Sequence, residues 1–263
     1  WQWELRGDTY RRHPDYMLDG WKGAPEGRHS QHKIRMFGRW YKGYAVDHHL
    51  AHIAGALFSS PFEESGILTA DGGGDYRMCA LAYGSGNNLP EIEYGWGYEG
   101  KGRLQLNIGR TWASIGEYNF GMKRLEGAGK LMGLASYGTP RQAIIDVLRQ
   151  QILYHPFSPY PRDEAGKLRV AKLDPKSTFA QDLCASLQAL TTEFYLEAAA
   201  RVKAWQPSRH LVLTGGCSMN CIANTAVHQS GLFEDTWVPA QPHDGGIALG
   251  QAVIADAIAR RGG

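Results

Sequence analysis

Residues 46–58 are Val46-Asp47-His48-His49-Leu50-Ala51-His52-Ile53-Ala54-Gly55-Ala56-Leu57-Phe58, a pattern that predicts a helix with one apolar face. Asp47 is a suitable N-cap, because its carboxylate can accept hydrogen bonds from the open N–H groups of the first turn. Leu50, Ile53 and Leu57 recur at helical spacing and predict the side that packs on a core. The remaining side is therefore available for chemistry.

His48 and His52 are four residues apart and project from that remaining side of the helix. Two imidazoles one turn apart can bind one transition-metal ion and leave coordination positions open for a substrate. The same spacing is equally compatible with two partly exposed histidines that bind nothing. His49 lies between the two faces and is expected to pack or to support the other two rings.

The composition restricts the class of protein. The chain has 263 residues, 43% of them hydrophobic, which is enough for a substantial core in one large domain or two lobes. A net charge of +2 gives no argument for a nucleic-acid partner. No apolar run is long enough for a membrane span and no signal peptide begins the chain, so we expect a cytoplasmic protein without a membrane partner.

The four cysteines also favour a reduced cytosolic protein, because no CxxC pair is present. They are Cys79, Cys184, Cys217 and Cys221. Cys217 and Cys221 could be suspected as ligands or as a nucleophile, but we expect small buried thiols.

Residues 1–43 form a basic, aromatic N-terminal arm, since residues 1–42 contain nine Lys/Arg and five Asp/Glu. Glycines and prolines interrupt the arm, which predicts an irregular or covering segment. Lys33 and Arg39, with Trp40 between Arg39 and Tyr41, could meet an anionic substrate or simply form a solvated surface.

A strand over 66–71 and a returning strand over 78–83 predict a hairpin with Gly72, Gly73 and Gly74 in its turn. Glycines let backbone N–H groups approach phosphate oxygens. A tight hairpin needs the same glycines without a ligand, so both interpretations remain open. Asp71 at the strand end is the residue that a plain turn explains least.

The middle of the chain offers fewer signals. Short strands are expected within 86–110, a surface excursion over 156–177, and a long core helix over 179–205. Lys130 lies among small residues and could reach a phosphate or carboxylate, or could be solvated.

A strand over 210–214 enters Gly215-Gly216-Cys217-Ser218-Met219-Asn220, and a helix follows to Val227. A strand, a glycine pair and a helix N-terminus can form a nucleotide or anion site. The GxGxxG fingerprint is missing, so a Rossmann fold is poorly supported. Asp244 precedes the last helix, where it could act as a cap or complete a His/His/Asp metal site.

As an ordered set, four motifs resemble the O-carbamoyltransferase family of nodulation and antibiotic carbamoyltransferases. They are the helix 48–52, the hairpin 70–74, the segment 129–138, and the loop 215–220 followed by 243–246. The chain is also similar to threonylcarbamoyl-transferring tRNA-modification proteins. The resemblance implies an α/β fold of the actin-like ATPase and sugar-kinase (RNase H-like) class over residues 44–263.

The resemblance also implies roles for individual residues. His48, His52 and Asp244 match the family's metal ligands, which implies Fe(II) or another divalent transition metal. The matches for nucleotide binding are the phosphate-facing turn Asp71, Gly72, Gly73 and Gly74, the nucleoside-facing loop residues Gly215, Gly216 and Asn220, and Lys130. Ser136 stands where the family usually has proline.

The implied activity is metal-dependent transfer of a carbamoyl group from carbamoyl-adenylate, made from carbamoyl phosphate and ATP, to a hydroxyl of a small molecule. His49 and His243 are the candidates for the base. The family's leading His-Asp-Ser motif and its YrdC-like domain, which makes carbamoyl-adenylate, are not found in these residues. We therefore expect an incomplete chain, or a partner chain that supplies the YrdC-like activity. Alternatives are a catalytically silent metal- and nucleotide-binding subunit and a phosphotransferase.

Overall fold

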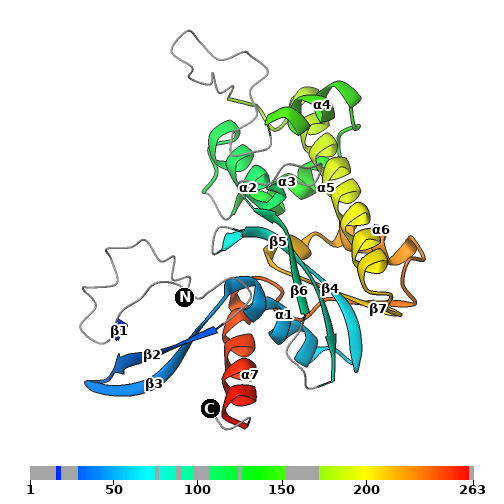
Figure 1. Cartoon of the computed structure of the whole chain (residues 1–263). Helices are drawn as coiled ribbons and strands as arrows, with labels where there is room; N and C mark the ends of the chain where they lie inside the picture. The colour runs from blue at the N-terminus through cyan, green and yellow to red at the C-terminus, as the bar shows by residue number, and fades with distance from the viewer. Residues whose placement is uncertain are drawn as a thin grey trace.

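The protein is described by a computed structural model over residues 16–18, 29–74, 77–86, 91–97, 107–123, 126–151 and 172–260. It combines a five-stranded mixed sheet, helices on both faces of that sheet, and a separate three-stranded antiparallel sheet (Figure 1). The predicted α/β class is confirmed.

The larger sheet has the order β6-β5-β4-β7-β8. Its strands are β4 (Glu64–Gly74), β5 (Arg77–Ser85), β6 (Glu91–Gly97), β7 (His210–Thr214) and β8 (Asp235–Trp237). β4, β5 and β6 pair antiparallel, whereas β4 with β7 and β7 with β8 pair parallel. The carboxyl ends of β4 and β7 therefore meet at one edge, with Thr69 opposite Thr214. This edge is where ligands usually bind in α/β sheets.

The helices are α1 (His48–Ser59), α2 (Ile108–Ser114), α3 (Gly127–Ala135), α4 (Gln142–Gln151), α5 (Thr178–Trp205), α6 (Cys221–Gln229) and α7 (Ile247–Arg260). Three short turns complete them: the π-turn η2 (Ile115–Asn119) and the 3-10 turns η3 (Gly216–Met219) and η4 (Asp244–Gly246). The long helix that the sequence predicts over 179–205 is confirmed as α5.

The central strand β4 is buried on both sides. Leu68 belongs to the main apolar cluster together with Leu187 of α5 and Leu213 of β7. Its neighbour Ile67 points the other way and belongs to a cluster with Ile53 of α1. Because consecutive strand residues face opposite sides, α5 and α1 cover opposite faces of the sheet.

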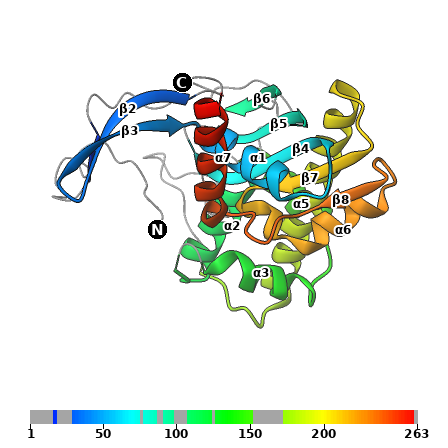
Figure 2. The same cartoon turned by 90° about the horizontal axis from the view of Figure 1, so that it is seen from below.

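The smaller sheet consists of β1 (Tyr16–Leu18), β2 (His29–Met36) and β3 (Arg39–Val46), in that order. The hairpin of β2 and β3 extends away from the rest of the molecule (Figures 1 and 2). The prediction of an irregular arm is therefore wrong for residues 29–43. Phe37 and Gly38 both have positive φ, 49° and 76°, which suits a tight two-residue hairpin turn.

Other expectations have mixed outcomes. The strands predicted over 66–71, 78–83 and 210–214 are confirmed. The prediction that Gly72, Gly73 and Gly74 form the hairpin turn is wrong, because β4 continues to Gly74, which pairs with Arg77 across an irregular register. β6 confirms strand structure within 86–110. Residues 156–171 of the predicted surface excursion lie outside the described residues.

All four cysteines are free thiols, as expected, but their burial differs. Cys79 and Cys184 are buried, whereas Cys217 is half-buried and Cys221 is exposed at the start of α6. In the described parts of the chain, no helix combines the length and apolar character that a membrane crossing needs.

Helices α1 and α7 touch through their backbones. A Cβ atom added to Gly250 would lie 1.7 Å from the carbonyl oxygen of Ala51, and one added to Gly55 would lie 3.0 Å from the backbone nitrogen of Gly250. Neither position tolerates a side chain without a shift of one helix. This contact fixes how closely the start of α7 approaches α1.

We predict that Gly250→Ala lowers the free energy of unfolding by about 1–3 kcal/mol, because it overpacks this crossing. Alanine normally stabilises a helix relative to glycine by up to about 1 kcal/mol. Gly133→Ala in α3 is the matched control, since a Cβ there meets nothing within 4 Å. Urea unfolding should give opposite signs for the two variants. Equal effects would contradict the backbone contact.

Candidate metal centre

The helix that begins this site is capped as the sequence predicts. The Asp47 carboxylate accepts a hydrogen bond from the backbone N–H of Leu50 at 2.8 Å, and the helix starts at His48. His52, however, is 3% exposed and His49 is fully buried, so the expectation of partly exposed histidines is wrong for His52. The reason is that His52 lies where the end of β4 and the turn η4 meet α1, with its Nε2 3.4 Å from both Asp71 and Asp244.

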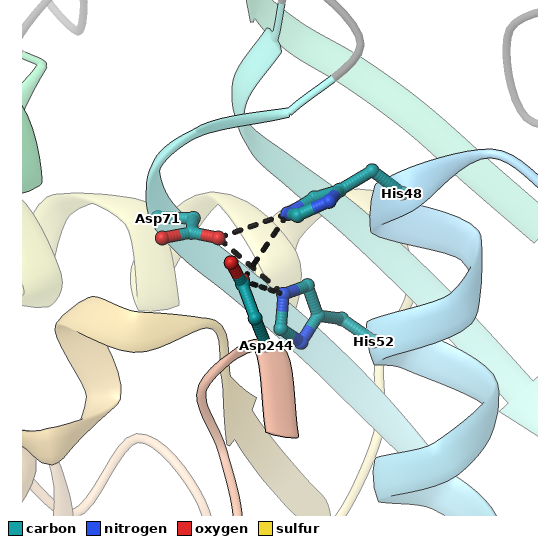
Figure 3. A group of neighbouring side chains, drawn as sticks. All are labelled: His48, His52, Asp71 and Asp244. Atoms are coloured by element: carbon teal, nitrogen blue, oxygen red, sulfur yellow. Dashed lines mark hydrogen bonds and ion pairs between the residues drawn. The ribbon is translucent and has the colours of Figure 1, made fainter. Parts of the chain in front are cut away.

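Four side chains converge at the carboxyl end of β4 (Figure 3). We call His48, His52, Asp71 and Asp244 the His/Asp cluster. His48 Nε2 lies 2.9 Å from Asp71 Oδ2 and 3.7 Å from Asp244 Oδ1. His52 Nε2 lies 3.4 Å from each of the same two oxygens. All four ligand atoms lie within 4.8 Å of one another.

These separations fit a metal ion. Metal bonds of about 2.0–2.2 Å place neighbouring ligand atoms roughly 3.0–3.5 Å apart. Imidazole nitrogens combined with carboxylate oxygens are a donor set typical of divalent first-row transition metals, including Fe(II). The cluster is therefore suited to the kind of ion that the family resemblance implies.

Electrostatics link the members of the cluster. Burial alone would lower the pKa of His52, but the contacts with Asp244 and Asp71 raise that pKa to about 9. Burial alone would raise the pKa of Asp71, but the hydrogen bond with His48 and the close contact with His52 hold it well below its ordinary value. In metal-free protein near neutral pH, the buried pair is an imidazolium and a carboxylate. A metal ion that binds here displaces the proton of His52.

The family resemblance assigns Asp71 to a phosphate-facing turn, which stays a prediction, and the structure places its side chain in the His/Asp cluster. Its Oδ2 faces the two histidines, while its Oδ1 accepts a hydrogen bond from the backbone N–H of Gly72 at 2.5 Å. A plain turn does not account for an aspartate at this position. Its approach to Asp244 depends on the pairing of β4 with β7, which the local sequence does not reveal.

The glycine pair after β7 has a packing reason. A Cβ on Gly215 would lie 2.2 Å from the carbonyl oxygen of Ala70, and the φ of Gly215 is 86°. A Cβ on Gly216 would lie 3.0 Å from Asp71 Oδ1. The pair thus allows the loop after β7 to approach the end of β4. A nucleoside-facing role for this loop stays a prediction.

Both the oxygen and the nitrogen of the Asn220 side-chain amide make hydrogen bonds within the protein. Its Oδ1 accepts hydrogen bonds from the backbone N–H of Ala223, at 3.0 Å, and from Gln188 Nε2, also at 3.0 Å. Its Nδ2 donates to Gln188 Oε1 at 2.9 Å. A direct contact of this amide with a nucleoside would require exchange of these bonds.

The other predicted site residues lie apart from the cluster's close contacts. Lys130 is exposed on α3, with its ammonium 3.6 Å from Glu126. His49 is buried between α1 and β4, where its Nδ1 lies 3.2 Å from Thr69 Oγ1. The exposed His243 caps η4, since its Nδ1 accepts from the backbone N–H of Gly245 at 3.0 Å.

Asn107 is a residue that the sequence did not single out. It is fully buried, its Oδ1 caps α2 by accepting from the backbone N–H of Arg110 at 2.9 Å, and its Nδ2 donates to the carbonyl oxygen of Gly72 at 3.2 Å. It thus ties α2 to the end of β4. An asparagine before a helix predicts a cap, but not the second bond.

Comparison with known proteins defines the class. Residues 41–253 match the family model described as the carbamoyltransferase N-terminus. This chain belongs to that family.

Among curated relatives, nodulation protein NolNO of Sinorhizobium fredii is 30% identical over 80% of this chain and 30% of its own length. The 3'-hydroxymethylcephem-O-carbamoyltransferase of Amycolatopsis lactamdurans is 29% identical over 84% of this chain and 42% of its own. The chain thus spans well under two thirds of the length of these relatives. Among solved structures, the activator of the 2-hydroxyisocaproyl-CoA dehydratase from Clostridium difficile matches 82% of this chain and 69% of its own, with a TM-score of 0.47 and 14% identity.

We predict that His52→Ala lowers the bound metal from about one ion per chain to a small fraction, because it removes a ligand from the centre of the cluster. Elemental analysis after anaerobic reconstitution with Fe(II) measures this, and circular dichroism checks the fold. His228→Ala, on α6 and outside the cluster, is the control. Unchanged metal in the His52 variant would refute the site.

We further predict a pH dependence of stability in chelator-treated protein. The pKa of His52 in the folded protein, about 9, lies above its ordinary value of 6.5. Its contribution to the free energy of unfolding is therefore complete below pH 6.5 and is lost as the pH rises through 9. The free energy of unfolding should fall by on the order of 3 kcal/mol over this range. Urea unfolding at several pH values should show this slope for the parent and not for His52→Gln. A parallel slope in both would contradict it.

Proposed function

We propose that this chain is the acceptor-side domain of an O-carbamoyltransferase, which moves a carbamoyl group from carbamoyl-adenylate to a hydroxyl of a small molecule. The observation that supports this most is the His/Asp cluster, in which three separate elements bring four ligand atoms within 4.8 Å. Membership of the carbamoyltransferase family and the relative that modifies a hydroxymethyl cephem support the same activity. The mixed sheet is compatible with the actin-like ATPase fold, which we include in the proposal.

A divalent ion, Fe(II) or a similar metal, would be held by the four cluster residues and would polarise the carbamoyl oxygen as a Lewis acid. The exposure of the ligands indicates the open side. The side chain of Asp244 is 28% exposed and that of His48 16%, whereas that of His52 is 1% exposed. Substrate therefore approaches past Asp244 and His48, and His52 forms the buried floor of the site.

The acceptor oxygen attacks the carbamoyl carbon, the bond from that carbon to the adenylate phosphate oxygen breaks, and adenylate leaves with the electron pair. A base must take the hydroxyl proton. His49 is fully buried, which separates it from an acceptor that enters from solvent. His243 is exposed, but its Nδ1 lone pair accepts from Gly245, so it can act as a base at Nδ1 only after that bond opens.

Nucleotide binding is the less direct part of the proposal. We assign the adenylate to the loop 215–220 and the glycines 72–74, with Lys130 as a further contact, on the family resemblance. The supply of carbamoyl-adenylate by a YrdC-like activity, in a partner chain or elsewhere in the same protein, belongs to the proposal as well.

We predict that Fe(II)-loaded protein, given carbamoyl-adenylate and a hydroxymethyl cephem, releases AMP and forms the carbamate. Asp244→Ala should lower the rate by at least about 100-fold, because it removes a metal ligand on the open side. Asp256→Ala, an exposed aspartate on α7 paired with Arg260, should leave it unchanged.

Metal binding without AMP release would favour a silent binding subunit. ATP consumption without any carbamoyl donor would favour a phosphotransferase.

A further inference from the structure

The three glycines after Asp71 differ in what a side chain would meet. A Cβ on Gly72 would lie 4.0 Å from its nearest neighbours, the backbone of Gly109 and Arg110, which is ordinary contact. Gly73 has a φ of 133°, a backbone conformation that side-chain-bearing residues rarely adopt even where there is room. Gly74 has an ordinary φ, and its requirement for glycine is steric.

A Cβ on Gly74 would occupy the space of the His48 ring. It would lie 2.1 Å from Cγ, 2.2 Å from Cδ2 and 2.5 Å from Nδ1 of His48, and these are its three nearest atoms. These three distances place the added Cβ over the face of the imidazole, close to Cγ. The Nε2, at the end of the ring away from Cγ, lies 2.9 Å from Asp71 Oδ2.

The ring, and not the helix, would yield to a side chain at position 74. The start of α1 is held by the Asp47 cap, and its middle is held by the backbone contact between Ala51 and Gly250. The His48 ring turns about two side-chain torsions, so rotation away from the cluster is the easier response. The nearest atoms to the added Cβ do not include His52, so only one ligand is displaced.

We propose that Gly74 is a positioning residue of the metal centre, because its missing side chain makes room for the His48 ring to point Nε2 at the metal position. The inference rests on the proposed metal centre. It gives Gly74, the last residue of β4, a function other than contact with phosphate. Gly74→Ala should therefore resemble His48→Ala, with three ligands left.

Co²⁺ titration is the test, because its visible absorption reports the coordination of the ion as well as its binding. Gly74→Ala should weaken Co²⁺ binding roughly 10–100-fold, as expected when the support of a ligand is lost, and should change the absorption. Gly133→Ala in α3, where an added Cβ meets nothing within 4 Å, is the control and should behave like the parent. Parent-like binding by Gly74→Ala would overturn the proposal.

A double-mutant cycle separates the ring contact from a general effect on the fold. In the His48→Ala background the space is vacant, so adding Gly74→Ala should cause no further loss of Co²⁺ affinity and no fall in Tm. An equal loss in both backgrounds, or a double variant that does not fold while His48→Ala does, would overturn the proposal.

Failure of the parent itself to bind Co²⁺ would refute the metal centre instead. The Tm values of the cycle, measured with a chelator present, would then still test the contact between Gly74 and His48.

Discussion

The backbone contact between α1 and α7 sets the distance across the His/Asp cluster. α1 contributes His48 and His52, and Asp244 lies in the turn that leads directly into α7. Because Gly250 meets the Ala51 carbonyl without an intervening side chain, the two helices approach as closely as their backbones allow. A wider crossing would move the Asp244 carboxylate out of range of both imidazoles.

The second support of the cluster is the parallel pairing of β4 with β7. It places Asp71 beside the loop that starts with Gly215, and the absence of side chains on the glycine pair leaves room for the carboxylate. Two carboxylates beside a buried histidine would be costly without positive charge. The raised pKa of His52 supplies that charge as a proton when no metal is bound. A positive charge would therefore lie beside the two carboxylates in both states, as the His52 proton in metal-free protein or as the ion in the proposed metal centre.

Local patterns predicted the local features. The Asp47 cap, the helical pair His48 and His52, the strands β4, β5 and β7, and the long helix α5 follow from spacing and residue type. The position of Asp244 before the last helix left a cap and a metal ligand open, and the family resemblance favoured the ligand. The burial of His52 could not be predicted, since its side chain lies between Asp71 and Asp244, and Asp244 is about 190 residues further along the chain. The place of Asp71 in the cluster and the reciprocal amide pair of Asn220 with Gln188 could not be predicted either, because both join distant parts of the chain.

The separation in sequence between the ligands has a consequence for biosynthesis. His48 and His52 leave the ribosome about 190 residues before Asp244 does, so the four ligands cannot meet until that stretch has been translated. A metal ion bound by all four residues closes a loop of about 200 residues, and long loops are those that a cross-link restricts most. In the proposed metal centre, ion binding would thus restrain the chain between α1 and η4 only after Asp244 has been made.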